Sequence, residues 1–464
     1  MAQLIKSPDM ALQHRHILLS VSLLYFLLLP SQLRAVTYVD CINDDPEKFP
    51  PCPALHEEGS DSEPQGETRP FQSATPENPD SDPRPQAAES RGNLELAISV
   101  FSQAAKVTPE NFLISPDGLY RALGLILMGA TGETRRLLQS YLGDNYSEPS
   151  LAAAPIATSS AQDEYSISNT MLLSSELEVK ETYRERLKQV NIDFRDNINF
   201  FDRVSLESLA DELNRLFSQL THGMIPQFCY ADQWSPATTM ALINSIYFKG
   251  LWERSFNVRK AGKFTLRDGQ RVNLNEFMVG EISFSQYTNH NDWQAVTVPY
   301  RGAHEMILVL PPKGIMPHEI SAEIIMALFS SLNSGESCPS CLKIAIGLPP
   351  FKVDSDIELS HFLRKTALHP LFTSPLELGA MLSDPLAVSI NMVHQHCAIE
   401  VNENGTRAAA VTHIALSRSA DGSKSIQFNR PFIYVLHNKI TKRILFIGQT
   451  LDPRSTSESG TGSH

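Results

Sequence analysis

The hydrophobic pattern of this chain changes its period along the sequence, and that change limits the folds that the chain can adopt. In "NLELAISVFSQAAKV" and "LESLADELNRLF" apolar side chains recur every three or four residues, which predicts amphipathic helices. Later segments alternate every two residues or are continuously apolar, as in "TTMALINSIYFKG" and "RILFIGQTL", which is typical of strands. Helices lead and strands follow, so the sequence predicts an α+β fold with large sheets.

Three segments refine this prediction. The stretch "NFLISPDGLYRALGLILMGATGETRRLLQSYL" predicts a short strand, a Ser-Pro turn and one long, buried helix. The segment "AVTVPYRGAHEMILVLPP" predicts a hairpin that turns at Arg301 and Gly302. A further short helix is expected at "ELSHFLRKTAL".

Residues 1–35 have the layout of a secretory signal peptide. Lys6 and Arg15 precede the apolar run "ILLSVSLLYFLLL", and small residues follow in "SQLRA". The run is too short to span a bilayer comfortably, although Leu33 fits a cleavage after Ala35 poorly and leaves a signal anchor as the alternative. We expect export, cleavage and an extracellular location.

Residues 36–92 form an acidic, proline-rich extension. They carry ten of the 30 prolines, with 13 acidic and four basic side chains in a chain whose net charge is −13. Such a segment buries too little apolar surface to offset its ordering entropy, so we expect a disordered spacer or an acidic arm that contacts a basic partner. The folded domain is expected at 93–453, before a disordered tail at 454–464. The remaining charge is also negative, which argues against nucleic acid as a partner.

Six cysteines in an exported chain predict disulfides by default. They are Cys41, Cys52, Cys229, Cys338, Cys341 and Cys397. Connectivity does not follow from sequence, but Cys41 with Cys52 and Cys338 with Cys341 are the local pairings. The last two form a Cys-x-x-Cys motif that redox chemistry or zinc would also use, but no second such pair accompanies it.

Catalytic and metal motifs are absent from the sequence: we find no Gly-x-Ser-x-Gly, His-Glu-x-x-His or phosphate-binding glycine loop. The segment "HQHC" places His394 and His396 on one face of a strand and Cys397 on the other, so the three cannot converge on one ion. A buried structural histidine is the favoured interpretation. No cofactor and no metal are expected.

Residues 400–432 contain the most informative local pattern. From Thr406 one strand face would hold only small or apolar side chains up to Leu416, whereas Arg407 and His413 fall on the other face. The stretch follows the turn-like "VNENG" and ends near Arg418 in polar "SADGSKS". It is either a connection whose alternation is accidental or a loop that can become a strand with a core side.

The stretch "VNENGTRAAAVT" followed by "FNRPFIYVLHNKITKRILFIGQTLDP" resembles the hinge, reactive loop and C-terminal strands of the serpin family of serine protease inhibitors. "NFLISP", "LGLILMGATGET", "ISNTMLL", "LNRLFSQLTHGMI", "ALINSIYFKGLWERSF", "MILVLPPKG" and "LPPFKV" are similar to the family's signatures, in the same order. The resemblance covers about 93–453. It implies three β-sheets, about nine helices and an exposed reactive-centre loop at about 405–425 that inserts into the largest sheet.

The resemblance also implies a mechanism. A serine protease attacks the loop and forms an acyl-enzyme, and loop insertion then distorts the protease before deacylation. The family's usual loop length places the cleaved residue at Ser419, and a register one residue shorter places it at Arg418. We favour Arg418-Ser419, because a guanidinium fills a trypsin-like pocket. The chain would then be an arginine-directed member of the antithrombin or antiplasmin type.

The family pattern assigns further roles and shows departures. The hinge would consist of Gly405, Thr406, Arg407, Ala408, Ala409 and Ala410, and the mid-sheet hydrogen-bonded cluster of Ser115, Asn244 and His394. Arg407 stands where a glutamate is usual, and Gly118 stands where the family usually has a serine. No Lys or Arg occurs in "GDNYSEPSLAAAPIATSSAQDEYS", so a heparin-type cofactor is not expected at the usual helix.

Two modifications follow from the motifs and the implied topology. Asn145 and Asn404 begin N-glycosylation sequons, and we expect Asn145 to be used more fully because a glycan at Asn404 would adjoin the hinge. If His394 points into the mid-sheet cluster, Cys397 faces the linker that carries Cys229. A Cys229–Cys397 disulfide is then one possibility, and two separate buried thiols the favoured alternative.

Two functions of different class remain open. The first is an extracellular inhibitor, expected to be a monomer, whose partner is a trypsin-like serine protease bound covalently. The second is a non-inhibitory serpin, a carrier or chaperone with a cleavable loop. Small hinge residues favour the first, whereas Arg407 and Gly118 leave room for the second. An enzyme is not expected, and neither is a membrane partner.

Overall fold

The computed structural model describes residues 85–143, 146, 163–189, 192–256, 258–283, 286–334, 343–384, 388–406 and 424–454. Eight α-helices occur within these residues: α2 (Pro85–Val107), α3 (Pro116–Gly129), α4 (Gly132–Leu142), α6 (Glu181–Gln189), α7 (Arg203–Leu220), α8 (Ala322–Ser334), α9 (Ser360–Leu363) and α10 (Pro370–Thr373). Two 3-10 turns, Ala231–Gln233 and Pro317–Glu319, complete the helical part that the structure describes. None of the described helices is long and apolar enough to cross a membrane.

The strands form three sheets, as predicted. The sheet that matters most for function has six strands, in the order β11 (Phe351–Glu358), β12 (Met392–Asn402), β13 (Gly405–Thr406), β4 (Met240–Leu251), β2 (Asp163–Ser174) and β3 (Asp193–Ile198). A second six-stranded sheet has the order β1 (Phe112–Ile114), β16 (Ile444–Thr450), β15 (Phe432–Asn438), β9 (His304–Leu310), β8 (Trp293–Pro299) and β7 (Tyr287–His290). The third has the order β14 (Lys424–Gln427), β10 (Lys343–Leu348), β6 (Arg271–Ser283) and β5 (Val258–Thr265).

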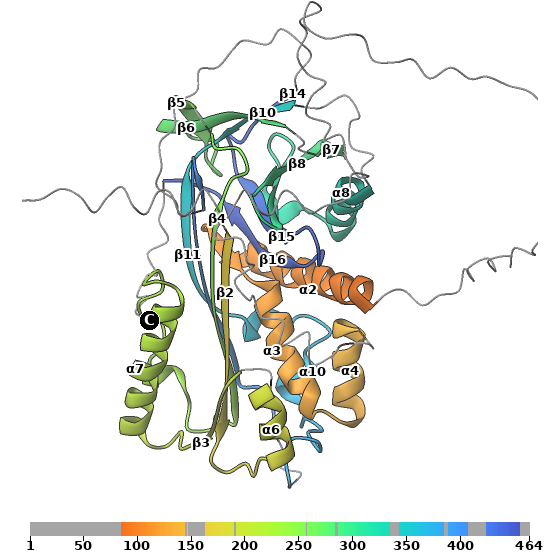
Figure 1. The fold of residues 1–464 in the computed structure, drawn as a ribbon, viewed down its shortest axis with the longest axis vertical. Helices are drawn as coiled ribbons and strands as arrows, with labels where there is room; N and C mark the ends of the chain where they lie inside the picture. The colour runs from red at the N-terminus through yellow and green to blue at the C-terminus, as the bar shows by residue number, and fades with distance from the viewer. Residues whose placement is uncertain are drawn as a thin grey trace, which may run out of the picture. The chain divides into compact units, whose positions relative to one another are not determined.

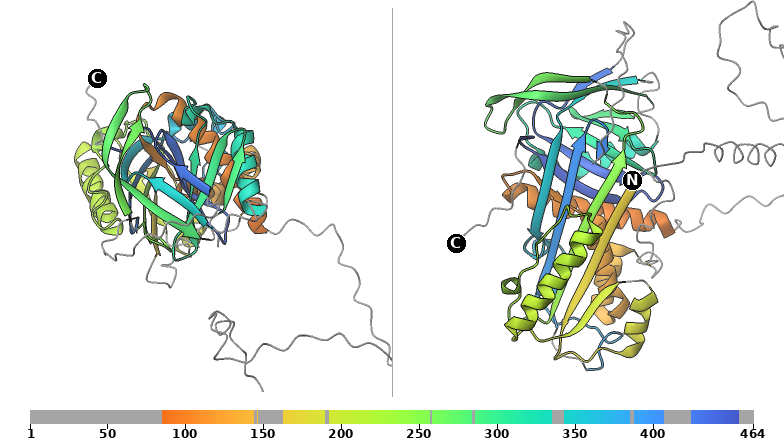
Figure 2. Two further views of the ribbon diagram at one scale, coloured as in Figure 1. Left: turned by 90° about the horizontal axis from the view of Figure 1, so that it is seen from above. Right: turned by 60° about the vertical axis from the view of Figure 1, so that its left-hand side comes forward.

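The long strands β2, β4, β11 and β12 have helices on both faces. Figure 1 shows α7 on one side of these strands and α3 on the other, and the right-hand view of Figure 2 shows α7 in front of them. Side chains follow this arrangement by strand alternation: Leu242 packs in the cluster of α2 and α3, whereas Ile243 packs in the cluster of α7. Such two-sided burial explains why β4 is buried at nearly every position rather than at alternate ones.

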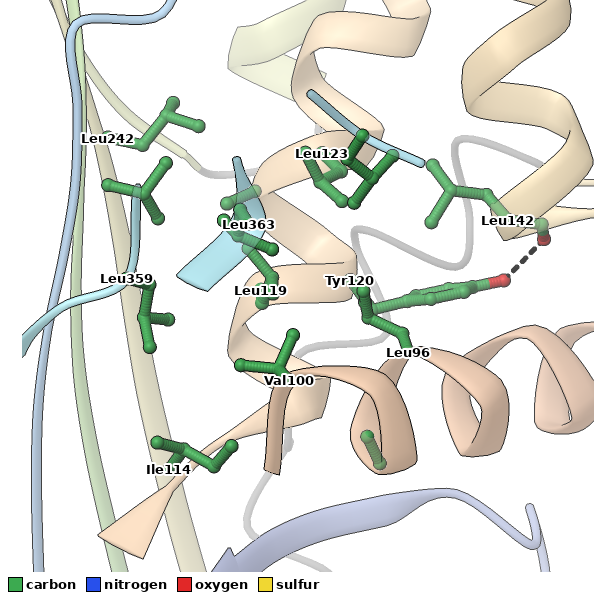
Figure 3. Packing of buried hydrophobic residues seen from close by; sticks show 14 of the residues in the cluster. Leu96, Val100, Ile114, Leu119, Tyr120, Leu123, Leu142, Leu242, Leu359 and Leu363 are labelled. Carbon is green, nitrogen blue, oxygen red and sulfur yellow. Dashed lines mark hydrogen bonds between the residues drawn. The ribbon is translucent and has the colours of Figure 1, made fainter. Parts of the chain in front are cut away.

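Helix α3 is buried along its entire length. Ser115 caps it by accepting a hydrogen bond from the Gly118 amide, and Pro116 occupies the first helical position. Figure 3 shows leucines of α3 packing with Leu96 and Val100 of α2 and with Leu242 of β4. Burial of each such side chain stabilises the fold by about 1.5–3 kcal/mol. This core fixes the position of the first turn of α3 beneath the large sheet.

One predicted element is divided in the structure. The long helix expected after the Ser-Pro turn is interrupted at Ala130 and Thr131, so that α3 and α4 are separate helices. Ala130 is extended, and Gly132 has a positive φ of 52° with the Glu377 carboxylate packed against it. The predicted hairpin at Arg301 and Gly302 is confirmed by the pairing of β8 with β9.

Candidate functional site

The boundary between β12 and β4, which we call the seam, is the candidate site. At one end the two-residue strand β13 lies between them: Thr406 is opposite Val401 of β12 and Gly250 of β4, both in antiparallel register. Further along, no strand intervenes, and β12 pairs directly with β4 in parallel from Met392↔Ala241 to Ala398↔Tyr247. The seam therefore has a hinge end that already holds a third strand and a middle that is closed.

Gly405 is required at the hinge end for a steric reason. Its φ is +148°, a conformation that L side chains rarely adopt, and a Cβ atom there would lie 2.1 Å from the Gly250 carbonyl oxygen. The next residue, Thr406, is buried, and its hydroxyl group is hydrogen-bonded to the Tyr300 hydroxyl with 2.8 Å between the oxygens. The first two predicted hinge residues are thus already part of the sheet.

The turn that leads into β13 is held in place by hydrogen bonds that its backbone carbonyl groups accept. The Trp252 indole donates a hydrogen bond to the Asn402 carbonyl (2.9 Å), and the Trp252 amide donates to the Asn404 carbonyl (3.0 Å). The Phe256 amide donates to the Glu403 carbonyl (2.8 Å). On the surface, Arg259 of β5 forms ion pairs with both Glu276 and Glu403.

The middle of the seam rests on the first turn of α3. Gln395 of β12 makes two hydrogen bonds with the backbone of Ser115: its Oε1 accepts from the Ser115 amide (2.6 Å) and its Nε2 donates to the Ser115 carbonyl (3.0 Å). Across the seam Gln395 is in register with Asn244 of β4, whose amide group donates to Asn169 of β2. Predicted Ser115 and Asn244 are thus both neighbours of Gln395, the first by hydrogen bonds and the second by register.

His394, the third predicted member of this cluster, lies on the other face of β12, and we correct its assignment. His394 and His396 contact Asp356 and Asp354 of β11, and both imidazole rings meet Phe228 edge-on at 5.2 and 5.0 Å. Phe228 belongs to the linker after α7. The prediction that the two histidines share one face is confirmed, but that face is opposite to Ser115.

The same one-residue difference in facing rules out the Cys229–Cys397 disulfide and confirms the favoured alternative, two separate buried thiols. Both thiols are free and buried. Cys229 packs with α7 and with Ala398, whereas Cys397 packs with Phe351 and Tyr434 on the other side of the sheet. Burial raises the pKa of both thiols, so neither is a reactive thiolate. Cys41, Cys52, Cys338 and Cys341 lie outside the described residues.

Gly118 is placed directly beneath the seam. A Cβ atom at this position would lie 3.1 Å from Ile246 Cδ1 of β4, 3.2 Å from Gln395 Nε2 and 3.3 Å from Ser115 Oγ. A serine here would be crowded by the Gln395 side chain. Glycine at position 118 leaves room for the side chains of Ile246 and Gln395.

Several predicted residues lie outside the described part of the chain. These are Asn145, Arg407, Ala408, Ala409, Ala410, Arg418 and Ser419. The last described residue of β13 is Thr406, and the next described residue is Lys424 in β14, which pairs in parallel with β10 of the four-stranded sheet. Segment 407–423 thus joins two sheets. Within the described residues no group of three or more His, Cys, Asp or Glu side chains is arranged to hold a metal ion.

The sequence did not predict three residues of the site: Gln395, Tyr300 and Trp252. Which residues of β12 face α3 could have been found from Thr406. Its partner is Val401, and residues two apart on a strand share a face, so 399, 397 and 395 face the same way as Val401. That inference needs the length of the turn, which the structure supplies.

Comparison with known proteins gives the family. Residues 91–453 match the family described as serpin, serine protease inhibitor. The chain belongs to the serpin family. Neuroserpin of Mus musculus is 26% identical over 374 residues, covering 76% of this chain and 88% of that protein. Glia-derived nexin of Rattus norvegicus is 27% identical over 372 residues, covering 77% and 92%. Membership places this serpin among protease inhibitors rather than enzymes.

Solved structures share the fold. Native protease nexin-1 with heparin has a TM-score of 0.65 at 25% identity, covering 80% of this chain and all (100%) of that chain. Tengpin, a thermophilic serpin in the native state, has a TM-score of 0.67 at 21% identity, covering 80% and 95%. These likenesses agree with the three sheets found here and confirm the predicted fold class.

Proposed function

We propose that this serpin is an extracellular suicide-substrate inhibitor of a trypsin-like serine protease. It would trap the protease as an acyl-enzyme by inserting the cleaved loop into the seam. The observation that supports this function best is β13: Gly405 and Thr406 already lie between β12 and β4, in antiparallel register with both. Loop insertion would continue a strand that has already begun.

Extending the observed register of β13 along β12 and β4 predicts the neighbours of each inserted loop residue. If β13 were lengthened without a bulge, Ala410 would come opposite Ile246 of β4 and Cys397 of β12, and Thr412 would come opposite Asn244 and Gln395. These neighbours face the core side of the sheet, which suits small side chains. Insertion replaces one ladder of hydrogen bonds by two, and each added bond contributes about 1 kcal/mol net.

Arg407 would fall on the opposite face in this register. Its neighbours would be Lys249 of β4 and Glu400 of β12, and Glu400 is itself in register with Lys352 of β11. The carboxylate of Glu400 could then pair with the guanidinium of Arg407. An arginine at this hinge position is therefore compatible with insertion, because it need not enter the core.

The chemistry is that of an interrupted acyl transfer. The protease serine would attack the Arg418 carbonyl carbon, the Arg418–Ser419 peptide bond would break, and an ester to the enzyme would form while the Ser419 amine leaves. Insertion before hydrolysis of the ester would leave the protease covalently attached. A guanidinium at Arg418 matches the carboxylate of a trypsin-like specificity pocket.

Mixing the purified protein with trypsin tests this proposal. We expect an SDS-stable complex and a released C-terminal fragment that begins at Ser419. Arg418→Ala should abolish the complex, whereas Arg407→Ala, an arginine of the same segment, should retain it as the matched control. Cleavage at Arg418 without a complex would favour the non-inhibitory alternative, and a fragment that begins at Ala420 would move the cleaved bond to Ser419.

A second test addresses insertion itself. Thr412→Glu should convert the inhibitor into a substrate, because the register places the added charge against buried Asn244 and Gln395. Thr412→Ser, which keeps the hydroxyl group, should inhibit normally. Unchanged stoichiometry of inhibition in the glutamate variant would contradict the proposed register.

We also propose that the chain is exported and glycosylated, mainly at Asn145. Asn404 is half-buried in the turn before β13, and its backbone is engaged at both ends: its amide donates to Asn402 Oδ1 and its carbonyl accepts from Trp252. The Thr406 hydroxyl of the same sequon is buried against Tyr300. Glycopeptide mapping of secreted protein should find lower occupancy at Asn404; complete occupancy in active inhibitor would contradict this.

A further inference from the structure

A buried carboxylate occupies the first turn of α3. Asp117 has no exposed surface, and three side chains from three parts of the chain surround it: Arg121 Nε at 2.8 Å, Arg443 at 2.6 Å and the Tyr165 hydroxyl at 3.1 Å. Burial favours the protonated acid, but the ion pairs with the two arginines outweigh it and hold the pKa of Asp117 below its ordinary value. Asp117 therefore accepts a hydrogen bond from Tyr165 as a carboxylate.

The same turn of α3 is bonded to the elements on the β12 side of the seam. Gln395 of β12 makes its two hydrogen bonds with Ser115, and Ser115 Oγ donates to the Leu445 carbonyl of β16 (2.7 Å). Just before the turn, the Leu113 amide donates to Ser355 Oγ of β11 (2.8 Å). The first turn of α3 is thus connected to β16 and β12, and the preceding strand β1 to β11, by side-chain hydrogen bonds.

Tyr165 belongs to the other side of the seam. It lies on β2 in register with Phe248 of β4, within a pairing that runs from Asp163↔Gly250 to Leu173↔Met240. Strands β2 and β4 must therefore move together. The Tyr165–Asp117 hydrogen bond crosses from this pair of strands to the turn of α3 that holds β12.

Lengthening β13 beyond Thr406 must part β12 from β4 along their parallel pairing. The first turn of α3 lies under both strands, since Gly118 adjoins Ile246 on one side and Gln395 on the other. It cannot follow two strands that move apart. Gln395 holds this turn on the β12 side by two hydrogen bonds to Ser115, and Tyr165 holds it on the β2 and β4 side through Asp117. Opening of the seam must therefore break one of these two attachments.

We propose that the Tyr165–Asp117 hydrogen bond is a latch that keeps the seam closed, with Tyr165 as a positioning residue for loop insertion. Arg121 and Arg443 keep Asp117 ionised and fixed, and the Arg443 guanidinium is held over the Tyr120 ring at 4.5 Å. The latch sets how readily β4 leaves β12. The inference rests on the proposed function in one respect: the strand that inserts into the seam is taken to be the reactive loop.

The test compares backbone hydrogen exchange in Tyr165→Phe and in a matched control, using the full-length uncleaved protein without protease. The control is Tyr183→Phe: Tyr183 is also buried, and its hydroxyl also bonds to α3, at the Leu125 carbonyl (2.7 Å), but from α6 rather than across the seam. We expect Tyr165→Phe to speed exchange in 241–247 and 392–398 about five- to tenfold, as for loss of one buried hydrogen bond. The control should leave these segments unchanged.

The same measurement on loop-cleaved protein separates a latch from a general stabilising contact. Once the seam is occupied by the inserted loop, Tyr165→Phe should no longer affect exchange there. Equal acceleration of exchange in Tyr165→Phe and Tyr183→Phe of the uncleaved protein, or no acceleration in Tyr165→Phe, would overturn the latch. A protein that shows the seam effect but forms no complex with trypsin would refute the proposed function and leave the latch standing.

Discussion

The hinge end of the seam and its middle are closed in different ways. At the hinge end a third strand is already in place. The surrounding residues contact its backbone and that of the turn before it: Gly250 packs against Gly405, and Trp252 donates hydrogen bonds to two carbonyl groups of the turn. In the middle, β12 and β4 pair with each other over side chains that are buried and polar, among them Gln395 and Asn244.

This difference teaches where the resistance to opening lies. The hinge end already has the arrangement that an inserted loop would extend, so it needs only small residues and one glycine. The middle must lose its parallel ladder, and it stands on a turn of α3 that contains a buried ion cluster. We therefore expect the largest mutational effects beneath the middle and smaller ones toward the surface of the hinge end.

The largest effect is expected from Asp117→Asn, which removes the charge beneath the middle of the seam. Arg121 and Arg443 would then be buried without their carboxylate, which costs about 3–5 kcal/mol of unfolding free energy. Urea unfolding at pH 7 measures this loss. Asp452→Asn, which breaks an ion pair with Arg454 near the surface, is the control and should change stability by no more than about 1 kcal/mol.

The pH dependence of Asp117→Asn follows from the same ion pairs. Because the folded-state pKa of Asp117 is lowered, its stabilisation is present above the pKa of the unfolded chain and is lost as the pH falls through the folded-state value. The wild-type protein should approach the variant's stability in acid. A constant difference between the two down to low pH would show that Asp117 is not an ion pair partner.

The next effect tests the hinge end. Gly405→Ala should destabilise the protein by about 1–3 kcal/mol, because φ is +148° and the new Cβ would meet the Gly250 carbonyl oxygen. We expect the amide of Leu251, opposite Gly405, to lose protection from hydrogen exchange. Gly269→Ala is the control: its φ is +84°, but no atom lies within 4 Å of a Cβ there, so it should leave Leu251 unchanged.

Much of this site was predictable from the sequence. The resemblance supplied Gly405 and Thr406, which lie in β13, and Ser115 and Asn244, which both lie beside Gln395, because local signatures fix which strands and turns are present. The period change predicted helices first and strands later, but the order is more mixed, because β2 and β3 precede α7 and α8 follows β9. The alternation of "HQHC" correctly placed the two histidines on one face.

The part of the site that was not predicted depended on which face of β12 packs against α3. Shifting the assignment by one residue exchanges the two faces of a strand, so choosing His394 instead of Gln395 also sent Cys397 to the wrong side. The Asp117 cluster was equally out of reach: it joins residues of α3, β2 and the segment before β16, and no local pattern relates Tyr165 to Arg443. Only packing brings them together.

A smaller effect concerns the side chains that line the hinge end. Tyr300→Phe removes the hydroxyl partner of Thr406, and Thr406→Val removes the other half of the same hydrogen bond. Each single change should cost about 0.5–1.5 kcal/mol. A double-mutant cycle measured by thermal unfolding should give a coupling energy of about 1 kcal/mol. Additive single effects would mean that the two hydroxyl groups do not interact.

The smallest effect is expected at the surface of the hinge end, in Arg259→Ala. Arg259 links β5 to the turn before β13 through Glu403, and it also pairs with Glu276, but about half (49%) of its side chain is exposed. Solvent screens such pairs, so the loss should be about 0.2–1 kcal/mol at low salt and should vanish near 1 M salt. Thermal unfolding at both salt concentrations measures it, with Lys260→Ala, an exposed neighbour on β5, as the control. If Arg259→Ala proved as damaging as Gly405→Ala, and equally so in high salt, the hinge end would be held by its surface ion pairs rather than by the backbone contacts of Gly405 and Trp252.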